Sequence, residues 1–140
     1  MTITFNAAGA GETWAAGGAD FRVLADGSAV DGRWGLVQCT VGPGWSGPPQ
    51  HIHREHDESF FILAGTVKFT SGLEELLATP GALVTAAIGD PHTFANADDQ
   101  APATLLCTVT LSGTSATSGS LPACVLGPTG DSTRPTFLPS

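Results

Sequence analysis

Turn-forming residues divide most of this sequence into short segments, and their spacing is what most limits the folds open to it. Such residues recur at positions 64–65, 71–72, 80–81, 89–91 and 97–102. The apolar residues between these turns show no sustained helical period of about 3.6 residues. Short segments between evenly spaced turns are typical of the strands of a β-sandwich or barrel. The sequence therefore predicts an all-β fold.

The expected strands follow from the positions of the turns. They cover residues 21–24, 34–41, 59–64, 66–69, 73–78, 83–86, 92–96 and 103–110. Residues 9–18 are small and are expected to be flexible, and residues 42–49 are expected to form a loop over the mouth of a cavity. The chain has 140 residues, which is enough for one domain with a substantial core. We assign that domain to residues 1–112.

Residues 113–140 differ in composition from the rest of the chain. They are mostly serine, threonine, glycine and proline, with isolated apolar residues. The default interpretation is a disordered or loosely attached C-terminal tail. An alternative is a shifted reading frame, because codons for residues 111–123 can be chosen so that another frame encodes an amphipathic helix. The absence of tyrosine from the whole chain fits the loss of such a segment.

The charge of the chain argues against two classes of partner. The formal net charge is −8, and lysine and arginine together number five. These residues are scattered, so nucleic acid and anionic membranes are poor partners. No apolar signal region follows Met1, and no apolar run approaches membrane-spanning length. The three cysteines lack the spacing of metal ligands, which favours a reduced, cytoplasmic setting.

Histidines are concentrated in one stretch of the sequence, residues 50–65. His51 and His53 are two positions apart, so on a β-strand both side chains would leave the same face. Glu58 opens the following apolar run, where an unpaired carboxylate would be costly to bury. His92 lies well downstream. Imidazole nitrogens together with a carboxylate suit one divalent transition metal, which would be Fe, Mn, Ni, Co, Cu or Zn.

The spacing of these residues resembles the two signature motifs of the cupin family. The first motif, H-x-H-x4-E-x6-G, is matched by His51, His53, Glu58 and Gly65. The second motif, G-x5-P-x-G-x2-H-x3-N, is matched by Gly81, Gly89, His92 and Asn96. The motif proline is replaced by Ala87, and Trp45 stands where a glycine is expected before the first histidine. The resemblance covers roughly residues 21–110, with its signature region at 44–96.

The resemblance implies a cupin jelly roll, the double-stranded β-helix. It also implies a metal held by His51, His53, Glu58 and His92. In related enzymes the carboxylate at the position of Glu58 is catalytic, because it orients or deprotonates the substrate as ligand and base. His56 fits neither spacing of the motif, so we expect it to face solvent. Asn96 is expected to be structural and to support the turn after the histidine strand.

Counting in steps of two along the strands gives the expected lining of a substrate pocket. Side chains that share a face with a metal ligand should line the cavity above the metal. A metal at the base of an apolar, aromatic-walled cavity is the usual form of a small-molecule site. The expected lining residues are Trp34, Leu36, Gln38, Phe60, Ile62 and Phe94.

The function expected from this pattern is that of a metal-dependent enzyme with a small-molecule substrate. The chain is similar to single-domain cupins that include quercetinase-type dioxygenases, which implies a small aromatic or enolisable oxygenated substrate. One alternative is a non-redox enzyme, such as an isomerase or a polyketide cyclase, and another is a metal-dependent binding module. Phe61 and Leu63 point away from the expected cavity, so we expect a homodimer.

Overall fold

The computed structural model describes residues 3–111, and these residues form two antiparallel β-sheets. In chain order the strands are β1 (Thr13–Ala16), β2 (Ala19–Ala25), β3 (Trp34–Val41), β4 (His56–Ala64), β5 (Val67–Ser71), β6 (Glu74–Ala78), β7 (Leu83–Ala86), β8 (Thr93–Asn96) and β9 (Ala103–Leu111). A short 3-10 helix, η1 (Ser28–Val30), lies between β2 and β3. The larger sheet has the order β1-β2-β3-β9-β4-β7, and the smaller has the order β6-β5-β8.

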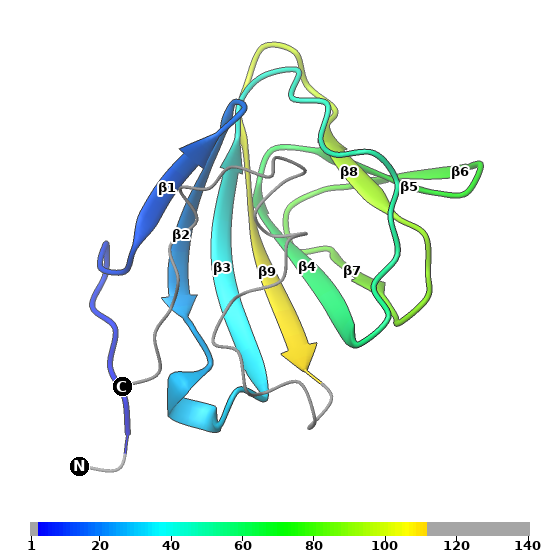
Figure 1. Cartoon of the computed structure of the whole chain (residues 1–140). Helices are drawn as coiled ribbons and strands as arrows, with labels where there is room; N and C mark the ends of the chain where they lie inside the picture. The colour runs from blue at the N-terminus through cyan, green and yellow to red at the C-terminus, as the bar shows by residue number, and fades with distance from the viewer. Residues whose placement is uncertain (1–2, 112–140) are drawn as a thin grey trace.

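Strand β9 joins the two halves of the larger sheet. It pairs with β3 along one edge and with β4 along the other, so strands far apart in the sequence become neighbours (Figure 1). The smaller sheet lies beside β4, at the upper right of Figure 1. This arrangement of antiparallel strands is the jelly roll of the cupin fold. The predicted all-β fold class is confirmed.

The core lies between the sheets because one face of each strand supplies buried side chains. In the larger sheet the buried side chains of β3 and β9 are Val37, Cys39, Val41, Ala103, Leu105, Cys107 and Val109. The smaller sheet contributes Phe69 and Phe94, whose ring centroids lie 5.3 and 5.2 Å from that of Phe60 on β4 and 5.9 Å from each other. This aromatic cluster ties the two sheets together.

Two local features differ from the expected strands. Residues 9–18 are not uniformly flexible, because β1 forms a hairpin with β2 through Gly17 and Gly18, both at positive φ. The hairpin is stabilised by Trp14 and Phe21, whose rings stack with centroids 5.1 Å apart. Strand β4 begins at His56 rather than at Ser59, and this places His56 on the same face as Glu58.

Asn96 is buried at the end of β8 and is structural, as expected. Its side-chain amide donates to the carbonyls of Gly42 and Ala101, and its oxygen accepts from the backbone of Asp98. The tail predicted at residues 113–140 lies outside the described residues. Within residues 3–111, no helix is long and apolar enough to cross a membrane.

Candidate metal centre

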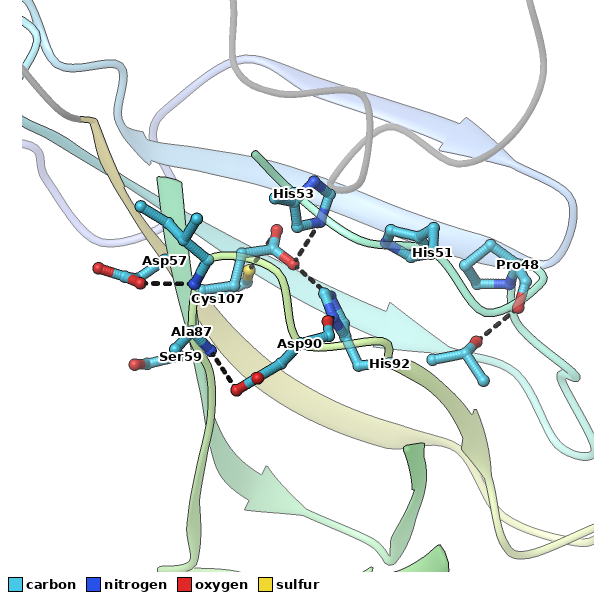
Figure 2. A network of polar contacts seen from close by, with 12 residues as sticks. Pro48, His51, His53, Asp57, Ser59, Ala87, Asp90, His92 and Cys107 are labelled. Atoms are coloured by element: carbon cyan, nitrogen blue, oxygen red, sulfur yellow. Dashed lines mark hydrogen bonds and ion pairs between the residues drawn. The ribbon is translucent and has the colours of Figure 1, made fainter. Parts of the chain in front are cut away.

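Four side chains from separate parts of the chain converge at one end of the core. They are His51, His53, Glu58 and His92, and each offers a ligand atom within 4.8 Å of the others. Glu58 comes from β4, His92 directly precedes β8, and the other two histidines lie in the segment between β3 and β4. Figure 2 shows the rings of His53 and His92 turned toward the same carboxylate.

Backbone hydrogen bonds fix the segments that carry the histidines. His51 and His92 form an isolated β-bridge, with N–H to carbonyl distances of 3.1 and 3.0 Å. The amide of Gly89 donates to the carbonyl of His53 at 2.8 Å. The sequence suggested that His51 and His53 lie on one strand, but they do not. They are held in a loop that is pinned to the turn before β8.

Backbone carbonyls also orient two of the imidazole rings. Nδ1 of His51 lies 2.9 Å from the carbonyl oxygen of Pro49, and Nδ1 of His92 lies 2.9 Å from that of Asp90. A carbonyl oxygen only accepts hydrogen bonds, so each Nδ1 carries a proton and donates it. This arrangement directs Nε2 of each ring to the centre of the cluster, as in metal sites whose histidines are fixed from outside.

Glu58 is the buried anion of the cluster, with 1% of its surface exposed. Its Oε2 lies 3.1 Å from Nε2 of His53 and 3.0 Å from Nε2 of His92. The contact with His92 is a hydrogen bond. Nε2 of His51 and Nε2 of His53 are buried and have no hydrogen-bond partner among residues 3–111, although the latter is close to Oε2.

Two buried imidazole nitrogens without a hydrogen bond beside a buried carboxylate fit a metal cation. Leaving such atoms unsatisfied costs about 1–3 kcal/mol each, and coordination would remove that cost. Three imidazoles and one carboxylate match the donors that Fe, Mn, Co, Ni, Cu and Zn accept. The residues present therefore fit one divalent transition metal, with His51, His53, Glu58 and His92 as its ligands.

The protein-family model for the cupin domain matches residues 37–109 of the sequence, which include all four of these residues. This chain belongs to the cupin family. No curated protein matches the sequence. Among solved structures, the KdgF protein of a Halomonas species superposes with a TM-score of 0.62 at 14% identity, over 72% of this chain and 86% of that one.

Two further cupin structures are similar to this chain. A predicted oxalate decarboxylase from Thermotoga maritima superposes with a TM-score of 0.62 at 19% identity, over 67% of this chain and 81% of that one. A sugar phosphate isomerase from Silicibacter pomeroyi superposes with a TM-score of 0.58 at 28% identity, over 68% of this chain and 60% of that one. This cupin therefore shares its fold with proteins named for different reactions.

The electrostatics of the cupin site differ between its histidines. Burial lowers the pKa of His92, but the hydrogen bonds to Glu58 and to the carbonyl of Asp90 outweigh it, so the pKa lies above its ordinary value of 6.5. Burial lowers the pKa of His51 below its ordinary value, although the hydrogen bond to the carbonyl of Pro49 raises it in part. His92 therefore keeps a proton to higher pH than His51 when no metal is bound.

The expectation that His56 faces solvent is wrong. Only 9% of its surface is exposed, and its ring stacks on that of His53 with centroids 4.2 Å apart. The cause is the early start of β4, since His56 and Glu58 are two positions apart on one strand and share its inner face. Burial is the main cause that lowers the pKa of His56. His56 is not one of the four residues whose ligand atoms cluster.

The structure brings only part of the expected pocket lining to the site. Phe60, Ile62 and Phe94 are buried on the inner face, and the ring centroid of Phe60 lies 6.2 Å from that of His92. Ile62 is wholly buried farther along β4.

The expected lining residues of β3 lie on the other face. Trp34 is 41% exposed, and Leu36 and Gln38 share its face, while Val37 and Cys39 point into the core. Gln38 accepts a hydrogen bond from Arg22 on β2. The sequence correctly predicts which side chains of β3 share a face, but it does not show which face turns inward.

Sequence reasoning missed Cys107 as a neighbour of the site. Its Sγ lies 3.9 Å from Oε1 of Glu58, and both groups are buried. Burial, and next the charge of Glu58, raise the pKa of this thiol well above its usual range. The alternation of β9 places Cys107 on the inner face with Leu105 and Val109, but only the pairing of β9 with β4 reveals the contact.

Proposed function

We propose that this cupin is a metal-dependent enzyme that acts on a small aromatic or enolisable oxygenated molecule, as quercetinase-type dioxygenases do. The observation that carries the proposal is the position of Glu58. Its carboxylate is buried, it is shared by His53 and His92, and it lies where it can serve both as a ligand and as a base.

An adjoining cavity supports a small-molecule substrate. It has a volume of about 460 Å³, and its lining includes the metal-site residue His92, the aromatic or apolar side chains of Phe60, Phe69, Leu76 and Val84, and the acidic residues Glu74, Glu75 and Asp90. Small-molecule sites are typically concave, mainly apolar and supplied with a few polar groups. Aromatic walls next to a metal-binding histidine favour a flat, uncharged portion of the substrate at this position.

The residues of the site have two kinds of role in the proposed reaction, as metal ligands and as a base. Bound at the four ligands, a divalent metal would supply Lewis acidity that makes a substrate hydroxyl more acidic. Glu58 accepts the proton of that hydroxyl and keeps the resulting anion oriented. His51 and His92 stay aligned because their Nδ1 protons are held by backbone carbonyls. Dioxygen is the oxidant, and both of its atoms enter the product.

A second candidate is a non-redox isomerase or cyclase. The 28% identity to a structure titled as a sugar phosphate isomerase favours this class. The same residues would serve it, since Glu58 could move a proton next to a carbonyl without any oxidant. A third candidate, a metal-dependent binding module, would use the ligands and the cavity but would not turn over its ligand.

Oxygen uptake separates these candidates. The metal-loaded protein is incubated with flavonols, diketones and sugar phosphates, while dissolved oxygen and substrate are followed together. Stoichiometric loss of oxygen and a flavonol or diketone supports the dioxygenase. Conversion of substrate without loss of oxygen contradicts it and supports the isomerase or cyclase. Saturable binding without conversion contradicts both enzymes and supports the binding module.

We also propose that the protein is a homodimer through the outer face of the larger sheet. Phe61, Leu63 and Leu83 lie on this face and are 40%, 43% and 63% exposed. Phe61 and Leu83 are directly paired between β4 and β7. Light scattering of wild type and of Phe61→Lys tests this, with a dimer mass expected for the first and a monomer mass for the second.

We further propose a reduced, cytoplasmic setting, which is supported by Cys39 and Cys107 being free thiols within residues 3–111.

A further inference from the structure

The two carboxylate oxygens of Glu58 face different neighbours. Oε2 lies within 3.1 Å of the Nε2 atoms of both His53 and His92, so it is the oxygen turned toward the metal ligands. Oε1 is turned instead to the Sγ of Cys107, at 3.9 Å. Figure 2 shows the sulfur of Cys107 beside this carboxylate. The terminal torsion of a glutamate is broad, so a donor at Oε1 adds to the contacts at Oε2 in fixing the plane of the carboxylate.

The sheet places Cys107 where it can select that orientation. β9 pairs with β4 so that Cys107 is opposite Phe60 and Val109 is opposite Glu58. Cys107 and Glu58 are thus diagonal neighbours on one face of an antiparallel pair, at a separation that side chains can bridge. β9 is also hydrogen-bonded to β3 on its other side, so the backbone that carries the thiol is fixed from both edges.

The thiol is a donor in this setting. A thiolate beside a buried carboxylate would place two negative charges together away from water, which is strongly unfavourable. A neutral thiol instead offers its S–H to the carboxylate, and a hydrogen bond to a charged acceptor is stronger than one to a neutral acceptor. The proton of Cys107 is therefore directed to Oε1.

We propose that Cys107 is a positioning residue of the metal centre, which holds Oε1 of Glu58 through its S–H and leaves Oε2 as the oxygen directed to the metal. The inference rests on the proposed metal-dependent function, because the orientation of Glu58 matters only if its carboxylate serves the metal. Groups that orient metal ligands from outside typically change affinity by about 10- to 100-fold when they are removed.

The test is a titration of metal-free protein with Co²⁺, with affinity and visible absorption measured for matched variants. Cys107→Val keeps an apolar volume but removes the donor, and Cys107→Ala serves as a second variant if valine disturbs packing. Both should bind one Co²⁺ about 10-fold or more weakly than wild type, with a changed absorption spectrum. Cys107→Ser keeps a donor and should restore affinity to within about threefold of wild type.

Cys39→Val is the matched control. Cys39 is also a buried cysteine of the larger sheet, on the neighbouring strand β3, where it is opposite Phe21 of β2 and Leu105 of β9. Its replacement should leave the Co²⁺ affinity unchanged. Wild-type affinity in folded Cys107→Val and Cys107→Ala, or an equal loss in Cys39→Val, would overturn the positioning role while leaving the metal centre intact. Failure of wild type to bind Co²⁺ would overturn the metal-dependent function as well.

An infrared measurement tests the hydrogen bond without any metal. The S–H stretching band of Cys107 can be assigned by its loss in Cys107→Ala, and that of Cys39 by its loss in Cys39→Val. A thiol that donates to a carboxylate absorbs at lower frequency, so the band of Cys107 should lie below that of Cys39. The difference should shrink in Glu58→Gln. A band of Cys107 that does not respond to Glu58→Gln would contradict the proposed hydrogen bond.

Discussion

Nε2 of His92 lies 3.0 Å from Oε2 of Glu58, although the two residues are 34 positions apart in the sequence. Glu58 belongs to β4 of the larger sheet, and His92 directly precedes β8 of the smaller one. The contact can therefore form only when the two sheets are packed together. A metal that binds both residues would link the sheets, so metal binding and folding stability should be coupled.

Replacement of each predicted histidine ligand by alanine should remove most of the bound metal. His51→Ala, His53→Ala and His92→Ala each remove one of the three imidazoles, which are the majority of the donors in the four-residue cluster. The measurement is metal per chain by plasma mass spectrometry after equilibration with equal amounts of Zn²⁺. Full occupancy in one of these variants would exclude that residue from the ligand set.

His56→Ala is the matched control for the histidine series. His56 is buried and stacks on His53, so its loss should lower the free energy of unfolding by about 1–3 kcal/mol. It is not part of the four-residue cluster, so the variant should still bind one metal per chain. Metal loss from His56→Ala equal to that from His51→Ala would contradict the four-ligand assignment.

Glu58→Gln should separate catalysis from binding. The amide keeps the length of the side chain and one oxygen donor, but it removes the charge and nearly all basicity. Three imidazoles remain, so metal occupancy should fall only in part. A general base contributes about 100- to 10,000-fold to the rate, so turnover per bound metal should fall by that order. Occupancy and rate are measured in the same preparation, and a near-normal rate per metal would show that Glu58 is no base.

Metal affinity should fall as the pH is lowered. The metal needs an unprotonated Nε2 on His92, and the pKa of His92 lies above 6.5 in the metal-free protein. Protons should therefore begin to compete above pH 6.5, with affinity falling about tenfold per pH unit once His92 is protonated.

In the metal-free protein the contribution of His92 to folding stability changes with pH in the opposite direction. Because the pKa of His92 is raised on folding, its contribution to stability is complete below about 6.5 and is lost as the pH rises through the folded-state value. The stabilisation gained on adding Zn²⁺, measured by thermal unfolding, should thus grow from acid to neutral pH. A metal-induced stabilisation that is independent of pH would contradict protonation of His92 in the metal-free state.

Much of this structure is predictable because side-chain alternation and turns are local properties. Strand β3 was expected at the residues where it is found, and β9 differs by one residue at its end. The four clustered residues follow from the spacing of the two motifs, although only Glu58 lies on a strand. Such local signals indicate which residues form strands and which side chains share a face.

Local signals do not indicate which face of a strand is buried or which strands are neighbours. The sequence predicts Trp34, Leu36 and Gln38 in the pocket lining because they share one face of a strand, yet the opposite face of β3 meets the core. His56 lies before the strand expected at residues 59–64, but pairing of β4 with β9 extends the strand to it. The contact between Cys107 and Glu58 depends on the same long-range pairing.

Asn96→Ala should destabilise the protein strongly without altering the metal ligands. Its side chain bonds the carbonyls of Gly42 and Ala101 and the amide of Asp98. Leaving these buried or half-buried groups unsatisfied should lower the free energy of unfolding by about 2–4 kcal/mol. Denaturant unfolding of the metal-free protein measures this loss. A change below about 0.5 kcal/mol would show that water replaces the amide, against the structural role assigned here.

X-ray absorption of the zinc-loaded protein tests the four-ligand assignment most directly, because it counts the atoms around the metal by type. Histidine nitrogens and carboxylate oxygens bind Zn²⁺ at about 2.0–2.2 Å, and cysteine sulfur binds at about 2.3 Å. With His51, His53, Glu58 and His92 as ligands and Cys107 outside the coordination sphere, the spectrum should show three imidazoles, only nitrogen and oxygen in the first shell, and no sulfur. A sulfur contribution, or fewer than three imidazoles, would contradict this assignment of the metal centre.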